Sequence, residues 1–297
     1  MSPTPRHLIL IEKARRPSGH AQGDLQAHDH ADLLWSKLHD EAEEVYEREP
    51  NLSTLLRRSV LDRASFDDAV VHRIANRLAN ESLAGAQIIA AFGHALRDDP
   101  AIAHAFRADI NAVIDRDPAC ERFIEPFLYF KGYHAIQTHR LAHWLWTSGQ
   151  NDLALYLQSR SSDIFQTDIH PAARIGKGVF LDHATGFVVG ATATIDDDVS
   201  ILQNVTLGGT GKESGDRHPK VRRGVMIGAG AKILGNIEVG EYSRVAAGSV
   251  VLRPVPPHST VAGVPAKVVN KSQKSEPYRD MDQILGQLAY DSFSYEI

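Results

Sequence analysis

The stretch from residue 169 to residue 251 repeats every six residues. An aliphatic residue begins each unit, and a small or short aliphatic residue follows four places later, as in Ile195 with Val199 and Ile201 with Val205. This period matches neither the repeat of a helix nor the simple alternation of a half-buried strand. Three such units close one coil of about eighteen residues, and successive coils stack their aliphatic residues into inner columns. The repeat therefore predicts a triangular solenoid.

The inner columns are expected to be the main source of stability in this half of the chain. Burying one Val, Ile or Leu side chain contributes about 1.5–3 kcal/mol. Small residues at the fourth following place fit tight corners, and most of the 22 glycines fall in the same stretch. All three tryptophans lie outside it, since a narrow prism leaves little room for them.

A helical domain is expected before the solenoid. The composition changes near residue 168, and a chain of 297 residues can hold two domains. Between about residues 31 and 160 the apolar spacing is helical, with Leu34, Leu38, Ala42 and Val45 on one face. Four aspartates stand where helix N-caps could lie, namely Asp67, Asp98, Asp99 and Asp117. Three histidines of the last helical segment are expected to make hydrogen bonds in the core or at an interface, namely His134, His139 and His143.

Composition excludes several classes of partner. The net charge is -5 with dispersed basic residues, so neither a nucleic acid nor an anionic membrane is indicated. The apolar stretches are far shorter than the roughly eighteen residues that span a bilayer. A single cysteine, Cys120, excludes an internal disulfide and fits the reducing cytoplasm, where we expect it to be buried packing. Residues 1–30 are polar and Pro-containing, which predicts a flexible tail.

Two interruptions of the repeat are the candidate sites of chemistry, because functional groups usually sit where a regular scaffold is broken. The first is the unit LDHATG, which begins at Leu181 and is followed by a two-residue slip in phase. The second is the loop GGTGKESGDRHPKVRR over residues 208–223, which has more basic than acidic residues in an acidic chain. Despite its glycines and lysine, GGTGK lacks the spacing and context of a phosphate-binding P-loop.

His183 is the candidate base of the first interruption. Histidine can remove a proton near neutral pH when another group fixes its tautomer. Asp168 precedes His183 by nearly one coil, so the two side chains could be stacked neighbours, with the carboxylate orienting the ring. The nucleophile would then come from the substrate. A corner hydrogen bond that merely ends a coil explains the same two residues.

The motifs together resemble one family. The runs DIHPAARIGKGVFLDHATG, VSILQNVTLGGTGK, GDRHPK and GVMIGAGAKILGNIEVG, with the helical segment RDPACERFIEPFLYFKGYHA, look like serine O-acetyltransferase. The resemblance covers about residues 31–297. The hexapeptide repeat alone is shared by many acyltransferases, whereas LDHATG combined with GDRHPK is far more specific.

The resemblance implies an α+β fold. An all-α N-terminal domain (31–165) would precede a left-handed parallel β-helix of hexapeptide repeats (166–270) and a C-terminal tail (271–297). It also implies trimers that pair through their helical domains, and L-serine and acetyl-CoA as substrates. Neither a permanently bound cofactor nor a metal is expected.

The family's functional residues can be carried over one by one. His183 corresponds to the general base and Asp168 to its orienting partner. Asp117, Asp182, Arg217 and His218 resemble the serine-binding set, in which an arginine can bind the substrate carboxylate and aspartates its ammonium group. Small residues of the flat coils would line the acetyl-CoA channel, namely Gly209, Ala229 and Ala247. Lys232 and Lys267 are candidates for its phosphates or are solvated surface lysines.

Three alternatives stay open. A related solenoid acetyltransferase acting on a sugar or xenobiotic hydroxyl would use the same base without Asp117 or Arg217. A metal-dependent hydratase on a similar solenoid would need three converging histidines. A binding role is the third: the end of the chain resembles the tail that this family inserts into O-acetylserine sulfhydrylase, although Ser-Tyr-Glu-Ile, ending in Ile297, departs from the usual ending. The family also suggests feedback inhibition by L-cysteine.

Overall fold

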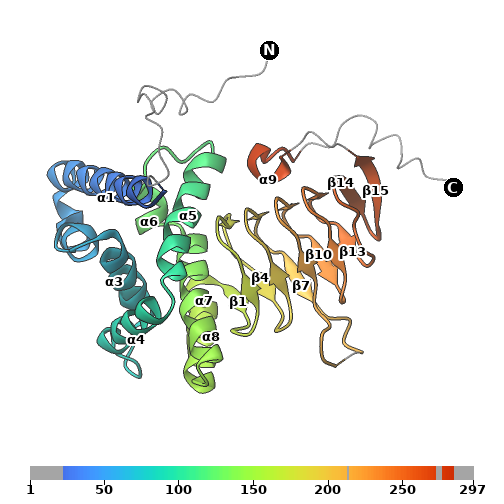
Figure 1. Cartoon of the computed structure of the whole chain (residues 1–297), viewed down its shortest axis with the longest axis horizontal. Helices are drawn as coiled ribbons and strands as arrows, with labels where there is room; N and C mark the ends of the chain where they lie inside the picture. The colour runs from blue at the N-terminus through green and yellow to red at the C-terminus, as the bar shows by residue number, and fades with distance from the viewer. Residues whose placement is uncertain (1–22, 213, 272–275, 284–297) are drawn as a thin grey trace, which may run out of the picture.

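The computed structural model describes residues 23–212, 214–271 and 276–283. Helices α1 to α8 gather at one end, and the coils of the solenoid are stacked beside them (Figure 1). Most of the expected flexible tail and the end of the chain, with Ile297, lie outside the described residues. Helix α1 already begins at Gly23, eight residues before the expected start of the helical domain.

The front half consists of helices joined by short turns, as its apolar spacing predicts. The helices are α1 (Gly23–Arg48), α2 (Ser53–Leu56), α3 (Phe66–Leu78), α4 (Gly85–Asp98), α5 (Ala101–Arg116), α6 (Ile124–Leu128), α7 (Lys131–Thr147) and α8 (Asn151–Phe165), with a 3-10 turn (Pro50–Leu52) and a π-helical turn (Arg57–Leu61) after α1. No helix of the described ranges is long and apolar enough to cross a membrane.

The expected N-caps are only partly right. Ser65 caps α3 by accepting a hydrogen bond from the Asp68 amide, while Asp67 lies in the first turn. Asp99 does accept from the amide of Ala101 at the start of α5, at 3.0 Å. Asp98 is the last residue of α4, and Asp117 follows the last residue of α5, so neither caps an N-terminus.

The three histidines of α7 make the expected hydrogen bonds in the core or at an interface. His134 bonds the carbonyl of Phe127 (2.8 Å), His139 that of Ala173 (3.1 Å) and His143 that of Pro171 (2.7 Å). The last two carbonyls belong to the first coil of the solenoid. The bonds of His139 and His143 therefore attach α7 to the β-helix. Cys120 is buried as packing against Val113 and Phe180.

A pH dependence of stability follows from His139. Burial, then the neighbouring His143 and Arg140, lowers the pKa of this imidazole to about 3. Because the folded pKa lies below the unfolded value, this stability is present above about pH 6.5 and is lost as the pH falls toward 3. We expect His139→Gln, whose amide nitrogen can still donate to Ala173, to reduce the slope of unfolding free energy by about 1.4 kcal/mol per pH unit between pH 6 and 5. Urea denaturation followed by circular dichroism measures it, and a wild-type slope would contradict the assignment.

The back half is a parallel β-helix with three sheets. Sheet A contains β1 (Thr167–Ile169), β4 (Phe187–Val189), β7 (Thr206–Gly208), β10 (Lys232–Leu234) and β13 (Val250–Val251). Sheet B contains β2 (Arg174–Ile175), β5 (Thr194–Ile195), β8 (Lys220–Val221) and β11 (Glu238–Val239). Sheet C contains β3 (Phe180–Leu181), β6 (Ser200–Ile201), β9 (Met226–Ile227), β12 (Arg244–Val245), β14 (Ser259–Gly263) and β15 (Ala266–Lys271).

The predicted inner columns are present. In sheet A the stacked residues Ile169, Val189, Leu207, Ile233 and Val251 are each at most 4 % exposed. The antiparallel hairpin of β14 and β15 ends the solenoid. The short helix α9 (Pro277–Asp280) then returns to pack against α5.

Both interruptions lengthen a coil. A regular coil pairs Lys232 with Val250, eighteen residues later. The coil that contains LDHATG pairs Asp168 with Val188, twenty residues later, and the next coil pairs Thr194 with Lys220, twenty-six residues later. The extra residues leave the prism at its corners and do not disturb the columns.

Candidate active site

His183 lies in a turn between β3 and β4 that forms a corner of the prism. We call the corner residues 182–186, together with 202–205, 228–231 and 246–249 stacked on them, the His183 corner. His183 and Ala184 both have positive φ, 55° and 61°. Such a conformation costs a non-glycine residue about 1–2 kcal/mol. The turn is held by Thr185 N–H donating to the His183 carbonyl (2.7 Å) and by Gly186 N–H donating to that of Gln166 (2.8 Å).

The His183 ring projects out of the prism, with its side chain 72 % exposed. Its Nε2 lies 3.6 Å from the carboxylate of Asp182. The ring is therefore accessible to a substrate and has a carboxylate beside it.

Asp168 lies in the strand that pairs with β4, but it is not stacked on the His183 turn. Its backbone pairs with Val188, and it is Gln166, two residues earlier, that bonds the His183 turn. The Asp168 carboxylate accepts a hydrogen bond from Gln158 of α8 at 2.6 Å. The expected stacking of Asp168 on His183 is wrong in register, because this coil contains two extra residues. The orienting role of Asp168 stays a prediction.

Asp117 and Asp182 are brought together from the two domains. Asp117 directly follows α5, and its Oδ1 accepts from the amide of Ala119 at 2.9 Å. Burial raises the pKa of Asp182, the adjacent His183 lowers it, and the charge of Asp117 raises it again. Two carboxylates that raise each other's energy form a site that a cation would stabilise.

His218 and Arg217 lie at another corner, between sheets A and B. We call residues 190–193, 209–212, 214–219 and 235–237 the His218 corner. His218 is buried, and its Nδ1 accepts from the hydroxyl (2.8 Å) and the amide (3.2 Å) of Thr192. Burial, then the charge of Arg217, lowers the pKa of this imidazole. Because Nδ1 accepts from the Thr192 amide, the proton of the neutral ring lies on Nε2.

Thr192 and Gly190 are parts of this corner that the sequence did not single out. The Thr192 hydroxyl also accepts from the amides of Arg217 (3.1 Å) and His218 (3.2 Å). A Cβ on Gly190 would lie 2.0 Å from the His218 ring. Both residues belong to the preceding coil. Their pairing with His218 cannot be counted from the six-residue repeat, because the long loop lies between them.

The proposed acetyl-CoA residues divide between the two corners. Ala229 and Ala247 stack on the His183 corner, where Gly248 N–H donates to the Ala229 carbonyl at 2.8 Å. Lys232 points at the same column and donates to Asn204 Oδ1 at 3.2 Å. Gly209 lies at the His218 corner, where an added Cβ would be 3.3 Å from Arg217 Cδ. Lys267 is exposed on β15.

The two corners are at opposite ends of the strands of sheet A. His183 precedes β4, and Gly190, against which His218 packs, follows it. A strand of three residues spans roughly 10 Å. One chain therefore holds the candidate base and the candidate carboxylate-binding pair apart.

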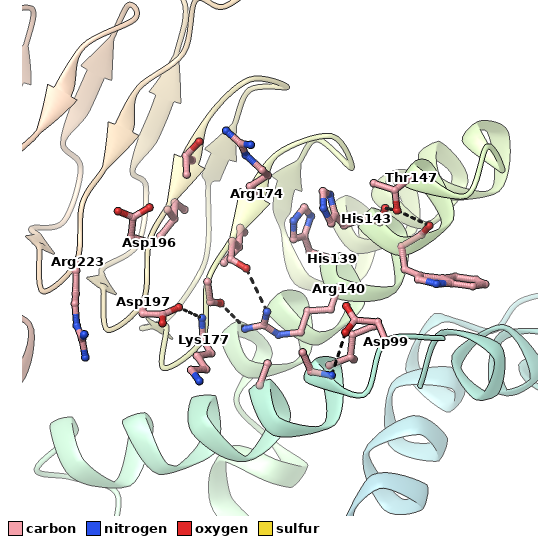
Figure 2. A pocket seen from close by; sticks show the side chains of 18 residues that line it. Asp99, His139, Arg140, His143, Thr147, Arg174, Lys177, Asp196, Asp197 and Arg223 are labelled. Atoms are coloured by element: carbon pink, nitrogen blue, oxygen red, sulfur yellow. Dashed lines mark hydrogen bonds between the residues drawn. The ribbon is translucent and has the colours of Figure 1, made fainter. Parts of the chain in front are cut away.

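Two cavities of the described chain lie away from both corners. A pocket of about 790 Å³ is found between α5, α7 and sheet B, and a smaller one of about 320 Å³ lies between α5 and the corner that joins sheets B and C. Neither is lined by a predicted site residue. Arg140 lines the larger pocket and donates to the Gly176 carbonyl at 2.8 Å (Figure 2). Arg140 also donates to Asp109 at 2.6 Å. This pocket lies at the interface between the helical domain and the β-helix.

Comparison with known proteins identifies the family. A family model described as serine acetyltransferase, N-terminal, matches residues 34–138, and one described as bacterial transferase hexapeptide (six repeats) matches residues 218–253. The serine acetyltransferase of Salmonella typhimurium is 52% identical over 85% of this chain and 92% of its own length. Serine acetyltransferase 2 of Arabidopsis thaliana is 48% identical over 83% of this chain and 76% of its own length.

Solved structures agree with the sequence relatives. The serine acetyltransferase of Vibrio cholerae has a TM-score of 0.83 and 52% identity, covering 86% of this chain and 98% of that one. The Brucella abortus enzyme in complex with coenzyme A has a TM-score of 0.82 and 57% identity, covering 83% and 99%. A serine acetyltransferase in complex with cysteine has a TM-score of 0.83 and 51% identity, covering 85% and 98%. With its helical domain, its hexapeptide solenoid and these relatives, the chain belongs to the serine acetyltransferase family.

Proposed function

We propose that this chain transfers the acetyl group of acetyl-CoA to the hydroxyl of L-serine, giving O-acetyl-L-serine and CoA. The observation that carries the proposal is the pair of carboxylates, Asp117 and Asp182, beside the exposed imidazole of His183, in a chain of this family. A sugar acetyltransferase would have no use for such a pair, because a sugar hydroxyl brings no cation to it.

The serine ammonium group binds between Asp117 and Asp182. Its positive charge offsets the repulsion between the two carboxylates and the burial that raises the pKa of Asp182. The serine hydroxyl is only a few covalent bonds away from the ammonium group. With the ammonium group bound there, the hydroxyl can therefore reach the His183 ring, which lies beside Asp182. The Asp182 carboxylate thus both binds the ammonium group and stabilises the positive charge that develops on the His183 ring.

The serine carboxylate binds Arg217 and His218 of a second copy of the chain. The neutral His218 donates from Nε2, and Arg217 supplies a guanidinium that can form two parallel hydrogen bonds. Because these residues lie at the opposite end of sheet A within one chain, a site shared between copies brings them to His183. This is the reason for proposing a trimer, with two trimers joined through the helical domains.

Acetyl-CoA lies between the same two copies. Ala229 and Ala247 leave the backbone of the His183 corner uncovered, so that the pantetheine arm can approach it, and Gly209 does the same on the neighbouring copy. Lys232 stands beside this column and is the better placed of the two lysines for a phosphate. The relative solved with coenzyme A supports this choice of donor.

The reaction runs in a ternary complex. His183 takes the proton of the serine hydroxyl while its oxygen attacks the thioester carbonyl, and backbone amides stabilise the oxyanion. The tetrahedral intermediate then expels the CoA thiolate, which receives the proton from the imidazolium. Asp168 orients the ring in this scheme and gains or loses no proton.

Regulation and partners follow the family. A relative is solved in complex with cysteine, which supports L-cysteine as an inhibitor that competes with L-serine for its site. The cytoplasm is the proposed location of the enzyme. Ile297, the residue expected to enter O-acetylserine sulfhydrylase, lies outside the described residues.

The function is tested by measuring CoA release from acetyl-CoA with a thiol reagent. We expect release with L-serine, suppression of that release by added L-cysteine, and none above background with a panel of sugar acceptors. D-serine is a matched control, because it carries the same groups with the wrong hand. Equal rates with sugars and with L-serine would refute the proposed acceptor.

A further inference from the structure

Arg116, the last residue of α5, is a buried cation at the junction of three parts of the chain. It is 6 % exposed. Its guanidinium donates to Ser200 Oγ (3.1 Å) at the start of β6 and lies 3.6 Å from the Asp198 carboxylate. The ring of Tyr278, in α9, stacks over it at 4.7 Å. One side chain thus ties the end of α5 to the solenoid and to the returning C-terminal segment.

The segment 276–283 is held by the same turn of α5 and by Ser200 of β6. The Tyr278 carbonyl accepts from Ser200 Oγ at 2.6 Å, and Arg279 pairs with Asp115 at 2.9 Å. Met281 packs on a small cluster formed by Val113, Cys120 and Phe180. These contacts surround the last turn of α5 on the side of sheet C.

Asp117 is the next residue after this turn, so its place depends on what holds the turn. Its amide still bonds the Val113 carbonyl at 2.8 Å, and Asp182 directly follows β3, whose Phe180 belongs to the cluster around Met281. The two carboxylates of the serine site are therefore carried by two backbone segments that meet at Arg116 and this cluster.

Charge neutralisation alone does not account for Arg116. Asp198 already has a second cation, because Arg223 pairs with it at 2.6 Å from the solvent side. Among the described residues, no hydrogen bond or ion pair joins Arg223 to α5. What Arg116 adds is the connection between β6, α9 and the turn that carries Asp117.

We infer that Arg116 is a positioning residue for the serine site: it fixes the separation of Asp117 from Asp182 and thereby the affinity for the ammonium group of the acceptor. The inference rests on the proposed function, since it assigns that site to serine. A purely structural arginine would change stability and the active fraction, but not the balance between the two substrates.

Steady-state kinetics on the full-length enzyme separate these roles, with Arg116→Met as the test and Arg223→Gln as the matched control at the same aspartate. We expect Arg116→Met to raise the KM for serine by about tenfold, below the roughly hundredfold that a misplacement of about 1 Å can cost. The kcat and the KM for acetyl-CoA should stay within about twofold of wild type. Arg223→Gln should leave all three parameters unchanged. Tyr278→Leu removes only the stacked ring, and it should raise the KM for serine in the same sense.

The outcomes are distinct. A wild-type enzyme without serine-dependent CoA release would overturn the proposed function. If Asp117→Asn raises the KM for serine but Arg116→Met and Tyr278→Leu do not, only the role of Arg116 is overturned. Equal rises in both KM values, or an equal effect of Arg223→Gln, would also overturn it. Should Arg116→Met not fold, Tyr278→Leu decides by the same split.

Discussion

Replacing His183 with alanine is expected to lower the turnover number by about 10²–10⁴-fold, the contribution typical of a general base. The melting temperature should stay close to that of the wild type, because the side chain is 72 % exposed and buries little surface. Thiol-release kinetics with saturating L-serine and acetyl-CoA measure the change. A His183→Ala enzyme with full activity would rule out this residue as the base.

The backbone at His183 calls for a second variant. His183 has a φ of 55°, a conformation that asparagine tolerates better than alanine does. His183→Asn therefore keeps the turn while removing the base, and its loss of activity should match that of His183→Ala. If only the alanine variant is inactive, rearrangement of the turn is the cause.

Asp168→Asn tests the orienting role against the same background. The amide can still accept the hydrogen bond of Gln158 through its oxygen, so the strand should keep its place. We expect a lower turnover number with the KM for serine retained, because the substitution weakens only the hold on the ring. A wild-type rate would count against Asp168.

The solenoid could be predicted in detail because its constraints are local. Every sixth residue must fill a column, and each corner position must hold a small residue. Val189, Leu207 and Ile233 therefore identify the columns without knowledge of their partners. The two interruptions could be found for the same reason, as departures from a count. The register across them could not, since it depends on how many extra residues leave the prism at each corner.

The helical contribution to the site was less predictable. Asp117 precedes a proline, which favours an N-cap reading, whereas it follows α5 and its charge raises the pKa of Asp182 in the solenoid. Thr192 and Arg116 act through contacts with residues that are distant in sequence, His218 and Ser200. No periodicity marks such residues, because a single polar contact imposes no repeat, whether it lies within the solenoid, as for Thr192, or between the domains, as for Arg116.

Gly132→Ala is expected to be the most damaging small substitution in the helical domain. Gly132 is the second residue of α7, where alanine would ordinarily stabilise a helix by about 1 kcal/mol. Here an added Cβ would lie 1.8 Å from the Leu181 carbonyl oxygen and 2.9 Å from its carbon. Both atoms belong to the backbone of β3 directly before Asp182 and His183, so relief requires the strand or the helix to move. Overpacking of this kind costs about 1–3 kcal/mol or more.

Gly93→Ala in α4 is the matched control. An added Cβ there has only the flexible end of Arg97 nearby, at 3.5 Å. The two substitutions should therefore change the free energy of unfolding in opposite directions, Gly93→Ala raising it by up to about 1 kcal/mol and Gly132→Ala lowering it. Urea denaturation measures both. Since the displaced carbonyl adjoins Asp182, Gly132→Ala should also lower turnover in the protein that still folds, and a variant as stable and active as wild type would show that α7 does not brace the His183 turn.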